Sequence, residues 1–201
     1  MAKGNQETPR KVAAEGHVRV TGGALRGRKL HPLRGMTIRP TSDYLKESIF
    51  NILAGSVEDA AVLDLFAGTG SLGIEALSRG ATTAVFVDNA PQAIKTLIKN
   101  VQTCSLEEQS TILKRNVLQG LNFLGSIGHI FDLIFIDPPY DKGCVKRTLQ
   151  LLGHSGSTAD SSSVVVEHSK REVLPDTVDC FTLSDRRDYG KTLVSFFSTV
   201  L

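Results

Sequence analysis

A glycine-rich segment carries the first sign of chemistry in this chain. Asp64 opens the segment, and Gly68, Gly70 and Gly73 follow with G-x-G-x-x-G spacing. Glycines let the backbone approach a ligand closely, and an acid such as Asp88, 18 residues beyond Gly70, can hold two ribose hydroxyls. The pattern alone allows NAD, FAD or S-adenosylmethionine, or only a tight turn between a strand and a helix.

The position of Asp64 separates these ligands. A carboxylate four residues before the first glycine repels a pyrophosphate, whereas it attracts the ammonium group of a cofactor that contains an amino acid. S-adenosylmethionine carries such an ammonium, a sulfonium and a ribose. The loop therefore favours S-adenosylmethionine over a dinucleotide.

A second loop, Asp137-Pro-Pro-Tyr140, has groups that can activate an amine. Prolines fix the backbone and remove donors, so the Asp137 carboxylate and the Pro138 carbonyl can both accept hydrogen bonds from an exocyclic –NH2 group. Tyr140 offers a ring on which a flipped base could stack. The competing interpretation is a rigid turn with an N-capping aspartate.

Strands that alternate with helices position both loops. Because each loop follows a buried strand, we expect the two loops at the carboxyl edge of a doubly wound α/β sheet. The expected strands are 60–66, 82–87, 111–113, 131–136 and 164–167, with helices over 72–78, 91–103 and 146–154, a short helix from 117, a serine-rich loop over 155–163, and a closing antiparallel pair of 181–183 and 192–197.

The N-terminal region differs in pattern and in charge. Residues 1–16 read as a disordered tail, and 17–56 as a basic β-hairpin (17–21 and 28–33) with a helix from about Asp43, ahead of a catalytic domain over 57–201. Residues 1–46 hold ten basic and three acidic groups, a net charge of +7 on a body of −5. A basic arm of this kind suits a polyanionic partner.

Composition excludes several classes of protein. The chain has 201 residues, 41% of them hydrophobic, and no apolar run of about 18 residues that could span a membrane. The opening residues lack the apolar core of a secretory signal, the three cysteines form no Cys-x-x-Cys pair, and the five histidines have no metal-ligand spacing. We therefore expect a cytoplasmic enzyme with reduced thiols and no metal.

The two loops together resemble amino-methyltransferases that modify nucleobases, and the chain as a whole resembles the RsmD family of small-subunit (16S) ribosomal RNA guanine-N2 methyltransferases. The resemblance covers about residues 17–197 and rests on residues 19–28, 39–41, 64–73, 75–80, 131–140 and 189–190. It implies a seven-stranded sheet, S-adenosylmethionine as the cofactor, and a guanine N2 in the 16S RNA of the small ribosomal subunit as the acceptor. The chain departs from the family at Tyr44, where a basic residue is usual, and at Asn116, where an acid is common.

Motif position then suggests roles for individual residues. The cofactor-binding set is Asp64, Phe66, Gly68, Gly70, Gly73, Asp88, Asn116 and Val117; the catalytic set is Asp137, Pro138 and Tyr140; the RNA-binding set is Arg19, Arg26, Arg28, Lys29, Arg39 and Thr41. Glu167, at the end of an apolar strand, could equally face the site or solvent. We expect a monomer.

Three alternatives differ in ways that can be tested. A DNA adenine-N6 methyltransferase would use the same chemistry but needs a segment that reads base edges, and only about 45 residues lie outside the catalytic body. A non-catalytic RNA-binding assembly factor gains little from an intact Asp137–Tyr140 loop. A dinucleotide oxidoreductase is disfavoured by Asp64.

Overall fold

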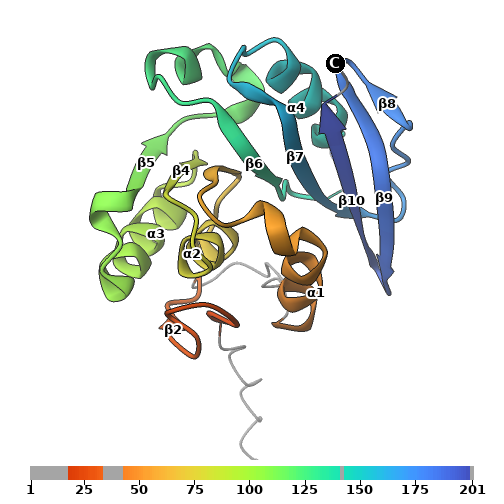
Figure 1. Cartoon of the computed structure of the whole chain (residues 1–201). Helices are drawn as coiled ribbons and strands as arrows, with labels where there is room; N and C mark the ends of the chain where they lie inside the picture. The colour runs from red at the N-terminus through yellow and green to blue at the C-terminus, as the bar shows by residue number, and fades with distance from the viewer. Residues whose placement is uncertain (1–17, 34–42, 141–142, 200–201) are drawn as a thin grey trace, which may run out of the picture.

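A mixed eight-stranded sheet organises the molecule, in the order β5-β4-β3-β6-β7-β10-β9-β8 (Figure 1). The structure is a computed structural model that describes residues 18–33, 43–140 and 143–199. The pairs among β5, β4, β3, β6 and β7 are parallel, and the remaining pairs are antiparallel. The strands are β3 (Ala61–Leu65), β4 (Thr83–Asp88), β5 (Ser110–Lys114), β6 (Phe131–Ile136), β7 (Thr158–Ser169), β8 (Thr177–Val178), β9 (Phe181–Tyr189) and β10 (Thr192–Thr199).

Helices cover both faces of this sheet, which confirms the predicted doubly wound α/β class (Figure 1). One face packs against α1 (Asp43–Leu53), α2 (Ser71–Ser78) and α3 (Pro91–Cys104), and the other against α4 (Cys144–Gly153). The short 3-10 helices are η1 (Ala54–Ser56), η2 (Glu107–Gln109), η3 (Val117–Gln119) and η4 (Asn122–Ser126). Successive strand residues point to opposite faces of the sheet. Val62 therefore belongs to the core beneath α1–α3, and Leu63 to the core beneath α4.

The predicted N-terminal hairpin forms, although its paired strands are short. β1 (Val18–Arg19) and β2 (Lys29–Leu30) are antiparallel, with Val18 opposite Leu30. The hairpin and α1 share the hydrophobic core that lies between the sheet and α2. Their buried residues in it include Val18, Leu30, Ile49 and Phe50. The hairpin and α1 are therefore packed directly on the elements that carry the glycine-rich loop. The predicted tail, Arg39 and Thr41 lie outside the described residues.

The C-terminal half corrects three expectations. The prediction of a serine-rich loop over 155–163 is wrong from residue 158 onward. β7 already begins there and lies between β6 and β10, with Ser163 opposite both Leu133 and Ser198. β9 extends to Tyr189, so the turn to β10 consists only of Gly190 and Lys191. The two-residue strand β8 adds an eighth strand to the seven that were expected.

In the part of the chain that is described, no helix is long and apolar enough to cross a membrane.

Candidate active site

Four carboxylates gather at the carboxyl ends of four adjacent strands. They are Asp64 on β3, Asp88 at the end of β4, Asp137 directly after β6, and Glu167 on β7. Each stands two residues beyond a buried residue that faces α1–α3: Val62, Phe86, Phe135 and Val165. Because side chains alternate along a strand, all four acids belong to that same face. Sequence position predicted three of them for the site and left the role of Glu167 open.

Asp64 is the most enclosed of the four. Its side chain is buried, and its carboxylate accepts a hydrogen bond from the Gly73 N–H at 3.0 Å. The pKa of Asp64 is raised to about 7, mainly by burial and to a smaller extent by the negative charge of Asp88, while the Gly73 hydrogen bond opposes the rise. This carboxyl group is therefore poised to ionise when a positive charge comes close to it.

Asp88 fixes the shape of the glycine-rich loop. One carboxylate oxygen accepts from the Gly68 N–H at 2.9 Å, and the other accepts from the Ala90 N–H at 2.8 Å. Phe66, between the strand and the first glycine, has a left-handed backbone with φ of 63°, which is uncommon for an aromatic residue. The loop is thus held in one conformation before any ligand arrives.

The three glycines of the loop meet different surroundings. A Cβ at Gly73 would lie 2.3 Å from the Phe86 ring, and one at Gly70 would lie 2.3 Å from Leu97, so packing of α2 already requires both glycines. At Gly68 the nearest atom would be 3.8 Å away, which leaves room for a ligand beside the backbone. Contact of all three glycines with a cofactor stays a prediction, and Gly68 has the space for it.

The predicted adenine contacts lie beyond the end of β5. The Asn116 side chain accepts a hydrogen bond from the Leu118 N–H at 3.1 Å and so caps η3, and Val117 is buried. The neighbouring Arg115 N–H donates to the Asp88 carbonyl at 3.0 Å, which brings this turn beside the acid at the end of β4. Asn116 therefore has a structural role that the sequence did not reveal, and its adenine contact stays a prediction.

Tyr140 is held in place by its hydroxyl group. That group donates to Glu167 Oε1 at 2.6 Å and lies 3.0 Å from Thr192 Oγ1 on β10, while the residue remains 37% exposed. Burial raises the pKa of Tyr140, and the negative charge of Glu167 raises it further, so the hydroxyl keeps its proton. A tethered ring with an open part of its surface can act as a stacking platform.

Asp137 lies between two other acids. Burial raises the pKa of Asp137 well above its usual range, and the charges of Glu167 and Asp64 add to this effect. Pro138, which follows it, is buried. The catalytic loop predicted from the sequence therefore lies beside the glycine-rich loop, and Glu167 is a further member that orients Tyr140 and tunes Asp137.

The hairpin residues predicted to meet phosphates are on the surface. Arg19, Arg26, Arg28 and Lys29 are all exposed, and Arg19 Nε forms an ion pair of 2.7 Å with Asp43 at the start of α1. Their contact with RNA stays a prediction.

A buried ionic network beneath the hairpin was not predicted. Glu75 on α2 accepts hydrogen bonds from the Thr21 N–H at 2.7 Å, the Thr21 hydroxyl at 2.8 Å, the Gly22 N–H at 2.7 Å and Arg79 Nε at 2.9 Å. Lys46 Nζ on α1 lies 3.7 Å from Glu75 and donates to the Arg19 carbonyl, and both side chains are fully buried. One carboxylate therefore joins the hairpin to α1 and α2.

A second unpredicted residue, Asn100 on α3, connects the hairpin to the glycine-rich loop. It accepts from the His31 N–H at 2.6 Å and donates to the carbonyls of His31 at 3.1 Å and Thr69 at 2.8 Å. A buried asparagine in an amphipathic helix is the signal that could have identified it, since buried amides need partners.

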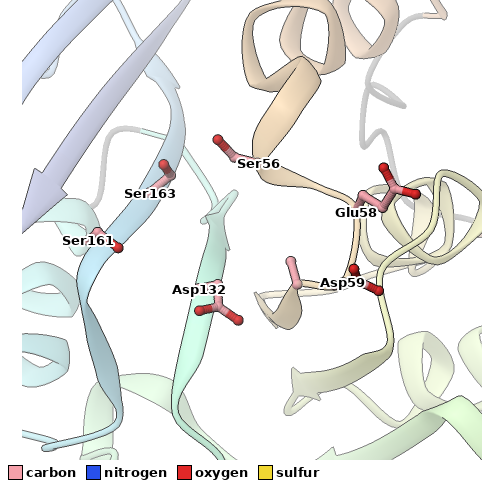
Figure 2. A pocket seen from close by; sticks show the side chains of 7 residues that line it. Ser56, Glu58, Asp59, Asp132, Ser161 and Ser163 are labelled. Carbon is pink, nitrogen blue, oxygen red and sulfur yellow. The ribbon is translucent and has the colours of Figure 1, made fainter.

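A cavity of about 330 Å³ lies away from the carboxylate cluster. Its lining comes from the segment that leads into β3, from the amino end of β6 and from the first part of β7, which is the opposite edge of the parallel sheet (Figure 2). The lining residues are Ser56, Glu58, Asp59, Ala60, Asp132, Ser161 and Ser163. Neither predicted loop contributes to it. Among the described residues, no group of three or more His, Cys, Asp or Glu side chains could hold a metal ion.

The raised pKa of Asp64 predicts a pH effect on stability. In the unfolded chain this carboxyl group has its ordinary pKa of 3.8, whereas in the folded chain its pKa is about 7. The stability that protonation of this group contributes is therefore fully present below about pH 4 and is lost as the pH rises to about 7. Urea unfolding of the ligand-free protein at pH 5 and 7.5 measures this loss, and Asp64→Asn should reduce it. An equal loss in Asp64→Asn would contradict the assignment.

Comparisons with known proteins fit this geometry. The family model described as "Conserved hypothetical protein 95" matches residues 18–198. "Putative rRNA methyltransferase YlbH" of Bacillus subtilis is 36% identical over 90% of this chain and 98% of its own length, and "Ribosomal RNA small subunit methyltransferase D" of Escherichia coli is 36% identical over 81% and 80%. A solved structure, "Putative methyltransferase yhhF from Escherichia coli", superposes with a TM-score of 0.77 at 34% identity and covers 92% of this chain and 98% of that chain. The fold is therefore the Rossmann-like methyltransferase fold, and the chain belongs to the RsmD family.

Proposed function

We propose that this protein transfers a methyl group from S-adenosylmethionine to the exocyclic N2 amine of a guanine in the 16S RNA of the small ribosomal subunit. The observation that carries the proposal is the placement of the Asp137–Tyr140 loop beside the glycine-rich loop, on one face of one sheet edge. The relative from Escherichia coli, named as a small-subunit ribosomal RNA methyltransferase, supports ribosomal RNA as the substrate class.

The residues of the glycine-rich loop fit S-adenosylmethionine. Asp64 and Asp88, which hydrogen-bond to the backbone of the loop glycines, can balance the sulfonium and ammonium charges of this ligand. The Ser71 hydroxyl at the start of α2 is buried and has no hydrogen-bond partner among the described residues, so it can serve a polar group of the ligand. The backbone at Gly68 has open space beside it. The bound cofactor supplies a methyl group that is activated by its attachment to positively charged sulfur.

Asp137 and the backbone after it prepare the acceptor nitrogen. Hydrogen bonds from the two amine hydrogens to the Asp137 carboxylate and the Pro138 carbonyl turn the nitrogen lone pair out of the plane of the base. The nitrogen forms a bond to the methyl carbon as the carbon–sulfur bond breaks, and it must then lose one proton. A carboxylate whose pKa is raised by burial and by Glu167 is a better acceptor for that proton than an ordinary aspartate.

Tyr140 gives the base its orientation. A guanine taken out of its RNA stack can lie on the tyrosine ring, which Glu167 and Thr192 hold from β7 and β10. The ring keeps the N2 amine next to Asp137, and it shields the reacting atoms from water. The aromatic residue therefore contributes by positioning.

The test is methyl transfer from labelled S-adenosylmethionine to small ribosomal subunits that have never been methylated. Naked 16S RNA and duplex DNA are assayed in parallel, and the labelled base is identified. Label on guanine N2 supports the proposal. Label on adenine N6 of DNA would replace it with a DNA methyltransferase, and cofactor binding without label on any substrate would favour a non-catalytic assembly factor.

The exposed basic hairpin gives a prediction about RNA affinity. Replacing Arg26 and Arg28 with Gln removes two cations whose side chains are exposed, so the protein should remain folded. If each cation neutralises one phosphate, the slope of log K against log salt should fall by roughly 1.4 to 1.8. Binding titrations of small-subunit RNA at several salt concentrations measure this slope. An unchanged slope would exclude the hairpin as the contact surface.

A further inference from the structure

The three tyrosines of the chain form a row next to the catalytic loop. Tyr140 contacts Thr192 through the 3.0 Å hydroxyl pair, and Thr192 is opposite Tyr189 in the β9–β10 ladder. Tyr189 in turn meets Tyr44 of α1, with ring centroids 6.1 Å apart and planes at 72°. Three segments that are distant in sequence therefore bring all of the tyrosines to one side of the active site.

This tyrosine row is open to solvent at its outer end. Tyr44 is 71% exposed, although its ring is large and apolar, and Tyr189 is only partly buried. An edge-to-face pair of this kind presents a ring face that can receive another flat ring.

The row also connects the basic hairpin to the active site. Arg19 of β1 pairs with Asp43 at 2.7 Å, and Asp43 immediately precedes Tyr44. Arg19, Tyr44, Tyr189 and Tyr140 thus link the first strand of the hairpin to the catalytic loop. A strand that contacts Arg19 and delivers a base to Asp137 would pass over these rings.

The charged side chains around the β9–β10 turn, next to Tyr189, suit a polyanion. Lys191 in the β9–β10 turn is exposed, and the pairing of Thr192 with Ser169 brings Lys170 and Arg171 close to it. Asp188 neutralises Lys170 through an ion pair of 2.6 Å, and its own pKa is lowered by that contact. Lys191, two residues after Tyr189, adds a cation next to the aromatic surface. Stacking rings combined with cations are the features that bind single-stranded nucleic acid.

We propose that Tyr44 and Tyr189 form a stacking step for an unpaired nucleotide that flanks the target base in the RNA. This inference rests on the proposed function, because it names how the same site holds the strand around its guanine. Stacking on an aromatic ring tolerates any base, so the step contributes affinity and alignment. The choice of base remains with the catalytic loop.

Binding of single-stranded RNA tests the stacking step without any methyl transfer. The probe is a fluorescently labelled, mixed-sequence 12-nucleotide single-stranded RNA, and its anisotropy is followed with the full chain. Tyr44→Ala should weaken binding roughly tenfold, while Tyr44→Phe should retain most of it. Ile130→Ala, which removes another exposed apolar side chain at the opposite edge of the sheet, is the matched control and should bind like the unmodified protein.

Tyrosine fluorescence gives a second, direct readout. The chain has three tyrosines, all in the row, and no tryptophan, so quenching of its emission by bound RNA reports stacking on these rings. Quenching that shrinks in Tyr44→Ala supports the proposal. Equal affinity and equal quenching in Tyr44→Ala and the unmodified protein would overturn it.

Kinetics on small ribosomal subunits separates this proposal from the proposed function. In Tyr44→Ala, KM for the subunit should rise roughly tenfold with little change in kcat, because the step binds RNA away from the reacting atoms. If the unmodified protein does not methylate subunits, the proposed function fails, and the RNA-binding experiment still decides the role of Tyr44. A lowered kcat with unchanged KM and unchanged RNA binding would contradict the stacking step.

Discussion

Asp137→Ala is expected to lower kcat for methyl transfer by roughly 10²- to 10³-fold, the size of effect seen when one directed polar group is removed from an active site. The reason is that the carboxylate orients the amine in the transition state and receives its proton, so no other described side chain on the loop can replace it. Affinity for S-adenosylmethionine should change little, since Asp64 and Asp88 remain. Single-turnover rates with labelled cofactor and equilibrium binding measure the two quantities separately.

Asp132→Ala is the matched control for this substitution. It removes the same side chain from the other end of β6, where the Asp132 carboxylate is exposed and accepts a 2.9 Å hydrogen bond from the Ala61 N–H at the amino edge of the sheet. Its methyl-transfer rate should stay within about twofold of the unmodified protein. A rate for Asp137→Ala that matches Asp132→Ala would remove Asp137 from the mechanism, whatever the acceptor proves to be.

The parallel half of the sheet was predictable because its strands are buried on both faces. Apolar runs such as 131–136, interrupted by Asp132, are typical of central parallel strands, and the structure has β6 at those residues. The antiparallel half was predicted less well. Residues 161–163 look like a loop by residue type, but Ser163 pairs with Leu133 of β6 and with Ser198 of β10, and this pairing on both sides outweighs the weak strand preference of serine.

The charged end of β9 was missed for a related reason. Residues 185–188 pair with β10 on one side, whereas β8 reaches only Phe181 and Thr182 on the other. That half of β9 is therefore an edge, where charged side chains are common because they discourage further pairing. Periodicity of apolar residues cannot detect such a strand.

The site divides in the same way between local and tertiary information. Asp64 was predicted from its spacing to the glycines, and Asp88 and Asp137 because each one follows an expected apolar strand, since parallel strands end at a common edge. The link from Tyr140 to Glu167 depends on strand order, which brings β7 beside β6. Lys46 and Glu75 read as ordinary surface residues of two helices, and only the packing of α1, α2 and the hairpin shows that they are buried partners.

A sequence signal for that packing does exist in the glycines of the hairpin. A Cβ at Gly22 would lie 2.3 Å from the Arg79 guanidinium, and one at Gly23 would lie 1.8 Å from the Ser78 carbonyl oxygen. The sequence favoured interpreting these glycines as flexible turn residues. They are needed because the hairpin backbone lies directly against the end of α2, where Ala24 N–H donates to the Ser78 carbonyl at 2.7 Å.

Glu75→Ala should destabilise the protein by about 3 to 5 kcal/mol, the usual cost of removing one member of a buried ion pair. The substitution leaves the Thr21 hydroxyl and two backbone N–H groups without their acceptor, and it leaves the Lys46 ammonium buried without its carboxylate. Burial already lowers the pKa of Lys46, which indicates how poorly this position solvates a charge. Urea unfolding of the full chain measures the loss, and Glu47→Ala, an exposed glutamate on α1, should cost within about 0.5 kcal/mol.

Adding Lys46→Met to Glu75→Ala separates the charge from the hydrogen bonds. The double variant removes the uncompensated ammonium but not the unpaired donors of the hairpin, so it should recover part of the lost free energy of unfolding. Because Glu75 joins the hairpin to α2, affinity for small-subunit RNA should fall in Glu75→Ala at urea concentrations where cofactor binding is still intact. A loss of less than about 1 kcal/mol in the free energy of unfolding of Glu75→Ala would mean that this network does not hold the hairpin against the catalytic sheet. The same conclusion would follow if RNA binding and cofactor binding were lost at the same urea concentration.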